Sequence, residues 1–148
     1  MSTRYRPVRL LIVRGLPGAG KSYYASRRRG YVHYEADQFW VGSDGVYRFE
    51  GARLSEAHSW CLDTVTEALM EGRSVVVSNT FTTRHEILPY IYAAEEARAL
   101  VEVVHVVRDF GSIHGVPAET LKKMAARWDR IEPIVCAPRE PVRYGTRR

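Results

Sequence analysis

A short stretch near the start of the chain combines glycines, a lysine and a serine at the spacing that phosphate binding requires. Residues 15–22 read GLPGAGKS and fit the pattern G-x-x-x-x-G-K-[ST] at every fixed position. In this pattern glycines let backbone N–H groups approach phosphate oxygens, the lysine reaches the terminal phosphates, and the hydroxyl is a ligand for Mg²⁺. We therefore expect Lys21 on nucleotide phosphates and Ser22 on the metal. The expected nucleotide-binding residues are Gly15, Leu16, Pro17, Gly18, Ala19, Gly20, Lys21 and Ser22.

A carboxylate follows the next apolar stretch of the chain. Residues 31–35 favour a strand, and Asp37 comes two residues after it. Phosphoryl transfer to an alcohol needs a group that accepts the proton of the attacking hydroxyl. With the phosphate loop upstream, we favour Asp37 as this general base over the alternative of a turn or helix-capping residue. Phe39 and Trp40 are candidates either for stacking an acceptor base or for packing in the core.

Other classes of nucleotide-binding protein are disfavoured. The chain has no N-K-x-D sequence, which a GTPase would use to read its base. A motor ATPase would end an apolar strand in aspartate, whereas the apolar run over residues 74–78 leads into Asn79 and Thr80. The phosphate loop alone does not separate kinases from ATPases or sulfotransferases, so the preference for a kinase depends on Asp37.

Strand and helix patterns alternate along the chain. This order predicts an α/β fold of three layers, with a parallel sheet of about four to five strands and a short lid. Ligands of such sheets bind outside the carboxyl ends of the strands, so we expect the chemistry just after residues 14, 35, 78 and 107. The predicted strands cover 9–14, 31–35, 74–78 and 100–107. Two predicted helices cover 20–29 and 54–69, and a further helix begins after Pro117. Another helix opens at a capping box over 83–86, and Pro89 either delays its start or kinks it.

The composition predicts one domain with cationic ends. The 148 residues are 45% hydrophobic and 26% charged, which is typical of a folded chain. The longest apolar run, residues 90–94, is too short to cross a membrane, so we expect a soluble cytoplasmic protein. We expect a kinase domain over 1–132 and a basic tail rich in proline and arginine over 133–148. Residues 1–30 hold eight basic side chains and no acidic one; such charge attracts nucleic acid, the alternative being solvated termini.

Beyond the phosphate loop, a longer series of short matches carries a family resemblance. The chain resembles the polynucleotide-kinase-like P-loop proteins, a group with many phage-encoded members, from residue 9 to about 131. The resemblance implies transfer of the γ-phosphate of ATP to a hydroxyl, often on nucleic acid, with Mg²⁺ and with Asp37 at the general-base position. The matching segments are 14–22, 37–39, 45–49, 57–60, 78–80, 86–90 and 113–117.

Two departures from the family pattern bear on the acceptor. Kinases that act on five-prime ends carry an arginine-rich lid, whereas residues 109–115 contain no arginine. Family members often have an aspartate in the turn after the third strand, and this chain has Ser78, Asn79 and Thr80 there. The transition-state cation is therefore open among Arg84, Arg108, Arg127 and His114. The candidate substrate-binding residues are Phe39, Trp40, Asn79, Arg84, Arg108 and His114.

The sequence thus predicts an ATP-dependent kinase that acts on a hydroxyl of nucleic acid, most simply DNA. Because a phage branch of such kinases phosphorylates hydroxymethyl-uracil within DNA, and because the lid is atypical for end processing, we favour that hydroxymethyl group as acceptor, in host cytoplasm if the chain is phage-encoded. The alternatives are a polynucleotide five-prime-hydroxyl kinase, a kinase for a small nucleoside-like molecule, and a non-catalytic ATP-binding module.

Overall fold

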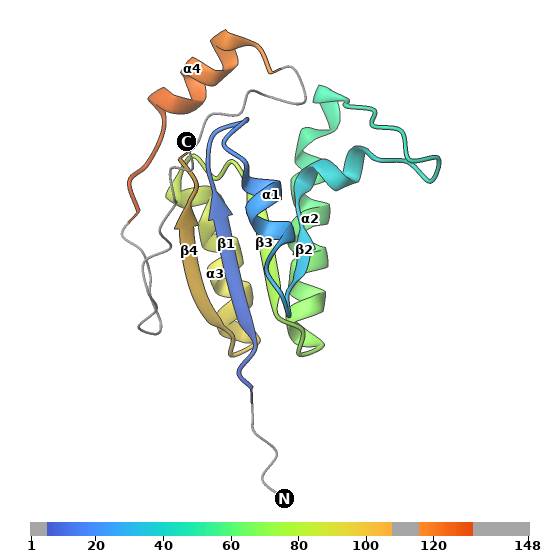
Figure 1. The fold of residues 1–148 in the computed structure, drawn as a ribbon, viewed down its shortest axis with the longest axis vertical. Helices are drawn as coiled ribbons and strands as arrows, with labels where there is room; N and C mark the ends of the chain where they lie inside the picture. The colour runs from blue at the N-terminus through green and yellow to red at the C-terminus, as the bar shows by residue number, and fades with distance from the viewer. Residues whose placement is uncertain (1–5, 108–115, 132–148) are drawn as a thin grey trace, which may run out of the picture.

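The sheet is the feature that positions the site. The computed structural model describes residues 6–107 and 116–131. In this part of the chain four strands form one parallel sheet in the order β2-β3-β1-β4 (Figure 1). The predicted α/β fold with a parallel sheet is confirmed. The strands are β1 (Arg9–Arg14), β2 (Val32–Tyr34), β3 (Val75–Asn79) and β4 (Leu100–His105).

Helices cover both faces of the sheet, which gives the three predicted layers. One face packs on the two long helices through Leu10, Ile12 and Val77, together with Val65 of α2 and Ile87 of α3. The other face packs on the short helix α1 through a smaller apolar cluster. The helices are α1 (Lys21–Ser26), α2 (Leu54–Met70), α3 (Arg84–Glu96) and α4 (Ala118–Ala126), and the 3₁₀ turns are η1 (Ala36–Trp40) and η2 (Gly51–Arg53).

The two central strands, β1 and β3, are buried on both faces. All five residues of β3 are buried, and five of the six residues of β1 are buried. β-Branched and apolar side chains suit such strands, since helices cover both sides of a parallel sheet. In the register of the sheet Arg14 pairs with Asn79 on one side and with His105 on the other, so the carboxyl ends of β1, β3 and β4 meet at one edge.

Two helices differ from the sequence prediction at their boundaries. α1 ends at Ser26 rather than near residue 29, and a turn with Gly30 at a φ of 82° follows it. The predicted delay of α3 by Pro89 is wrong, because α3 begins at Arg84 and contains Pro89. Thr83 caps the helix by accepting a bond from the Glu86 N–H at 3.4 Å. The Glu86 carboxylate bonds to the N–H and hydroxyl of Thr82 instead of completing a capping box.

Some predicted features lie outside the described residues. These are the lid stretch with Arg108 and His114, and the basic tail over 133–148. Within residues 6–107 and 116–131 no helix has the length and apolar character of a membrane span.

Candidate active site

The phosphate loop runs from β1 to α1 at the carboxyl edge of the sheet. Gly18 and Gly20 have φ angles of 85° and 86°, in the left-handed region that favours glycine. At Gly15 a side-chain Cβ would come within 2.7 Å of the Val106 carbonyl oxygen, so glycine is needed where the loop passes the end of β4. Lys21 Nζ donates to the Leu16 carbonyl at 3.0 Å and so lies across the loop. The loop thus has the backbone geometry of the predicted phosphate site.

Burial and charge act against each other on Lys21. Burial lowers the pKa of Lys21 to about 8, and the negative charges of Asp37 and Glu35 oppose that shift. Burial makes the charged form of an amine less stable, and an anion that binds beside the amine stabilises that charged form. Lys21 is therefore suited to hold a phosphate in the space between the loop and the end of β2.

Asp37 lies in η1, the turn that follows β2. Asn79 fixes the start of this turn, because its Oδ1 accepts a bond from the Ala36 N–H at 2.8 Å. The Tyr47 hydroxyl donates to Asp37 Oδ1 at 3.4 Å, and burial together with the Asp37 charge raises the pKa of Tyr47 to about 12. Asp37 itself is half-buried. The structure thus brings the predicted base and the predicted phosphate lysine to the same edge.

Asn79 was predicted as a substrate-binding residue, but its contacts are internal. Its side chain is buried, with Oδ1 on the Ala36 N–H and Nδ2 at 3.6 Å from Cys61 Sγ. Both ends of the amide are therefore engaged with the protein. Asn79 acts on the site through η1, by holding the turn that carries Asp37.

The two aromatic candidates differ in their exposure. Trp40 is only 4% exposed and packs edge-on against Phe39 and Phe49, with ring centroids 5.0 and 5.1 Å away. The stacking role for Trp40 is therefore wrong, because a buried ring offers no face to a base. Phe39 is half-buried, with the Arg53 guanidinium over its ring at 5.1 Å. Phe49 is 56% exposed and is the aromatic side chain of this cluster that solvent reaches most freely.

A glutamate that the motif analysis did not single out contacts the phosphate loop. Glu35, the last residue before η1, accepts a bond from the Ser22 hydroxyl at 2.6 Å on its Oε2 atom. Ser78 Oγ donates to the same oxygen at 2.9 Å, and His33 Nε2 lies 3.4 Å from it. Burial raises the pKa of Glu35, but the bonds from His33, Ser22 and Ser78 outweigh burial and lower it overall. Glu35 continues the extended backbone of β2 by one residue, so alternation places His33 and Glu35 on one side, which is the signal that could have found the pair.

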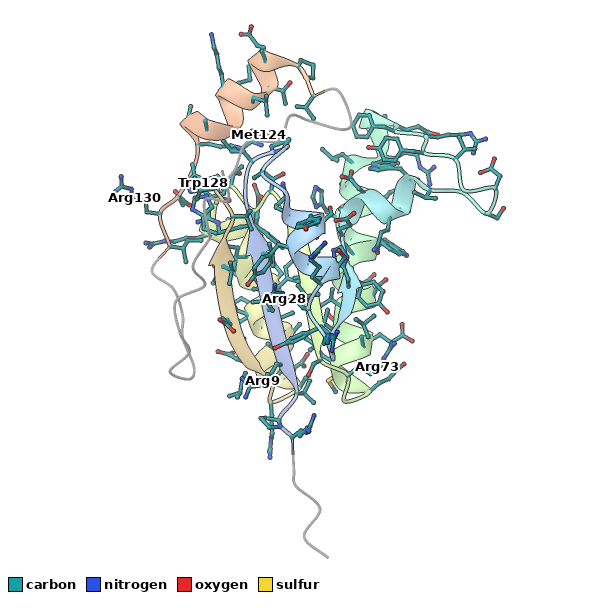
Figure 2. The ribbon with its side chains drawn as sticks, viewed as in Figure 1. Arg9, Arg28, Arg73, Met124, Trp128 and Arg130 are labelled. Atoms are coloured by element: carbon teal, nitrogen blue, oxygen red, sulfur yellow. The ribbon has the colours of Figure 1, made fainter. Side chains whose placement is uncertain are left out.

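Three arginines near the other end of the edge hold chain segments together. Arg14 is 2% exposed and donates to the carbonyls of Phe81, Thr82 and Asp129, with Trp128 stacked on its guanidinium at 3.9 Å. Figure 2 shows Trp128 near the carboxyl ends of β1 and β4. We call these contacts the Arg14 clamp.

Two candidate transition-state cations belong to the same region. The Arg84 guanidinium donates to the Arg130 carbonyl at 3.2 Å, and Arg127 Nε donates to the Thr82 hydroxyl at 3.0 Å. Both side chains join the segment after α4 to the loop between β3 and α3.

The donor atoms at the edge fit magnesium. The side chains that meet there offer hydroxyl and carboxylate oxygens, from Ser22, Glu35 and Asp37, and such hard ligands suit Mg²⁺. Within the described ranges no group of three or more His, Cys, Asp or Glu side chains forms a metal cage. A magnesium ion here would accordingly be shared with nucleotide phosphates, as is usual for this cation.

A glycine-rich phosphate loop on a parallel sheet, with an aspartate opposite its lysine, defines a kinase-like P-loop domain. The family model described as AAA domain (AAA_33) matches residues 10–110, and the chain belongs to this family. The predicted resemblance is confirmed at the level of a P-loop kinase-like family, while the phage branch stays a prediction.

The chain spans only part of the length of the proteins that it matches in sequence or in fold. NEDD4-binding protein 2 of Homo sapiens is 27% identical over 158 residues, a match that takes in 94% of this chain and 9% of that protein. A chain of the Pnkp1/Rnl/Hen1 RNA repair complex has a TM-score of 0.55 at 18% identity, covering 85% of this chain and 39% of its own. The APS kinase CysC of Mycobacterium tuberculosis, in complex with AMPPNP and APS, has a TM-score of 0.53 at 15% identity, covering 80% and 69%. At these identities the structural likeness shows the fold.

Proposed function

We propose that the protein is an ATP-dependent kinase that phosphorylates a hydroxyl on nucleic acid, with the hydroxymethyl group of hydroxymethyl-deoxyuridine in phage DNA as the favoured acceptor. The observation that carries the kinase assignment is the position of Lys21 and Asp37 at the same edge of the sheet, Lys21 at the start of α1 and Asp37 in η1, close enough for the Asp37 charge to act on Lys21. Such a pair has a cation for the phosphates and a base for the acceptor in one site.

The roles of the residues follow from their positions. Lys21 and the loop N–H groups bind the β- and γ-phosphates of ATP, and Ser22 would hold Mg²⁺, which neutralises the charge of those phosphates. The acceptor oxygen attacks the γ-phosphorus, the bond to the bridging oxygen breaks, and ADP leaves. Asp37 orients the acceptor hydroxyl and takes its proton. Asn79 keeps Asp37 in place through the Ala36 N–H.

Charge on the face covered by α1 supports a polyanionic acceptor. Arg27 and Arg29 are exposed at the end of this helix, and the Arg27 guanidinium stacks on Tyr23 at 4.1 Å. Arg28 stacks on Tyr24 at the same distance, and Figure 2 shows it over the face of the sheet that α1 covers. Arginine side chains bind phosphate oxygens well, and aromatic rings that stack on arginine suit nucleic-acid strands.

The test offers three acceptors in parallel to the protein with γ-labelled ATP and Mg²⁺. They are duplex DNA that carries hydroxymethyl-uracil and has blocked ends, an ordinary oligonucleotide with a free five-prime hydroxyl, and free nucleosides. We expect label on the modified duplex, because the hydroxymethyl group projects into the major groove or becomes accessible when the base is flipped. The rate should fall with salt, with a slope of about −0.9 per neutralised phosphate on a log–log plot.

The other outcomes separate the alternatives. Label on the five-prime end alone would favour the end-processing kinase. Label on a free nucleoside with no dependence on salt would overturn the nucleic-acid acceptor. Nucleotide binding with no labelled acceptor in any arm would favour a non-catalytic ATP-binding module.

A further inference from the structure

The contact between Glu35 and Ser22 joins the end of β2 to the phosphate loop. Three groups converge on one oxygen: the Ser22 hydroxyl at 2.6 Å, the Ser78 hydroxyl at 2.9 Å and His33 Nε2 at 3.4 Å from Glu35 Oε2. His33 and Ser78 also bond to each other at 2.7 Å. Glu35 is thereby held from two strands while its carboxylate meets Ser22, the metal-binding residue of the loop pattern.

The direction of the Ser22 bond matters for metal binding. A serine hydroxyl has one proton and two lone pairs, and a cation binds a lone pair. Glu35 accepts a hydrogen bond from the Ser22 hydroxyl, so the lone pairs of Ser22 Oγ are turned toward other partners. Ser22 is exposed, so those partners can include a bound ion. Without Glu35 the hydroxyl would be free to turn its proton toward the cation.

The strand next to the loop in the sheet supplies no carboxylate at this position. β3 ends in Ser78 and Asn79, and Asn79 is committed to the Ala36 N–H and Cys61. Magnesium sites in nucleotide-binding proteins usually combine one or two carboxylates with phosphates and waters. Of the described carboxylates, Glu35 is the one that the structure bonds to Ser22.

We propose that Glu35 is the carboxylate of the magnesium site and that it orients the Ser22 hydroxyl for the metal. This inference rests on the proposed function only in that the loop binds ATP with Mg²⁺. Ser78 and His33 hold the carboxylate in place. Glu35 is a positioning residue, since it acts on the metal through Ser22.

The experiment measures the affinity of a non-hydrolysable ATP analogue with excess Mg²⁺ and with EDTA, for the wild-type chain and for Glu35→Gln. Glutamine keeps the size of the side chain and removes its charge. We expect the gain in affinity that Mg²⁺ provides to fall by about 10- to 100-fold, as is usual when an outer partner of a metal ligand is changed. The affinity in EDTA should stay the same or rise, because a negative charge near the phosphates has gone.

Direct metal binding gives the second readout. Electron paramagnetic resonance measures the affinity for Mn²⁺ with the analogue present, and this affinity should fall in Glu35→Gln by the same factor. Glu71→Gln is the matched control, because Glu71 is exposed at the end of α2 and pairs with Arg73 away from the loop. The control should behave as wild type in both measurements.

A double-mutant cycle tests whether Glu35 acts through Ser22. If it does, Ser22→Ala combined with Glu35→Gln should lose little more Mg²⁺ dependence than Ser22→Ala alone. Additive losses would show that Glu35 acts independently of Ser22 and would overturn the proposal. An unchanged Mg²⁺ gain in a folded Glu35→Gln would overturn it as well. Because these assays contain no acceptor, a failed acceptor assignment leaves them unaffected.

Discussion

The two halves of the catalytic edge are built differently. On the nucleotide side, residues from β2, β3 and the phosphate loop bond to one another through polar side chains that converge on Glu35. On the acceptor side, Asp37 lies in a short 3₁₀ turn. The last residue of this turn, Trp40, is buried, and its first residue, Ala36, donates its N–H to the side-chain amide of Asn79. In the first half, side chains from three segments of the chain meet at one carboxylate. The second half is a single short turn, held by a capping box between Glu35 and Gln38 and by the bond from the Ala36 N–H to Asn79. The nucleotide half therefore depends on one shared carboxylate, and the position of Asp37 depends on the turn in which it lies.

The largest effect that this comparison predicts is on the nucleotide side. Lys21→Ala should lower the rate of phosphate transfer by about 10³-fold or more, because it removes a charge that acts on the phosphates as they react. The affinity for ATP should fall too. Turnover of labelled ATP and binding of an ATP analogue measure the two effects. Lys122→Ala, on the exposed side of α4, is the control. Transfer that survives within about tenfold, or 1.4 kcal/mol of barrier, would contradict the assignment of the loop.

On the acceptor side the effects of base and nucleotide should separate. Asp37→Asn keeps the shape of the side chain and removes its ability to take a proton, so turnover should fall by about 10²- to 10⁴-fold. The dissociation constant of the ATP analogue should change little, because the loop and Glu35 are untouched. Asp63→Asn, on the exposed surface of α2, provides the matched control. Near-normal turnover in Asp37→Asn would make Asp37 a structural turn residue.

A smaller effect should arise one step behind the base. Asn79→Ala leaves the Ala36 N–H without its partner, so turnover should fall by about 10- to 100-fold as η1 shifts. The free energy of unfolding should drop by about 1–3 kcal/mol. Kinetics and thermal unfolding measure these effects, and Thr66→Ala, whose hydroxyl bonds within α2, is the control.

A companion substitution isolates the part of Asn79 that matters. Cys61→Ala removes the sulfur contact of the amide nitrogen and leaves the bond to Ala36 possible. It should reduce turnover less than Asn79→Ala does. Equal losses in the two variants would show that general packing around Asn79, rather than the bond to Ala36, sets the position of Asp37.

The sequence was informative where the backbone itself restricts the residue type. The phosphate loop was predictable because Gly18 and Gly20 adopt positive φ angles that other residues rarely take. The parallel sheet was predictable from its alternation with helices. The Glu35–Ser22 contact was not, because it depends on the order β2-β3-β1-β4, which brings β2 beside β3 and toward the start of α1. The burial of Trp40 and Arg14 likewise depends on tertiary packing, because it cannot be predicted from the residue type alone.

The Arg14 clamp also sets how α4 is attached. None of the nine residues of α4 is buried, whereas five residues of α2 are, and the bonds to the rest of the fold come from the segment just after α4, at Arg127, Asp129 and Arg130. Figure 1 shows α4 apart from the sheet, at the end where the strands point. Such a helix opens locally at a lower free energy than the core does. We therefore expect amide hydrogens of α4 to exchange with solvent sooner than those of α2, while the clamp keeps the segment after α4 joined to the end of β1.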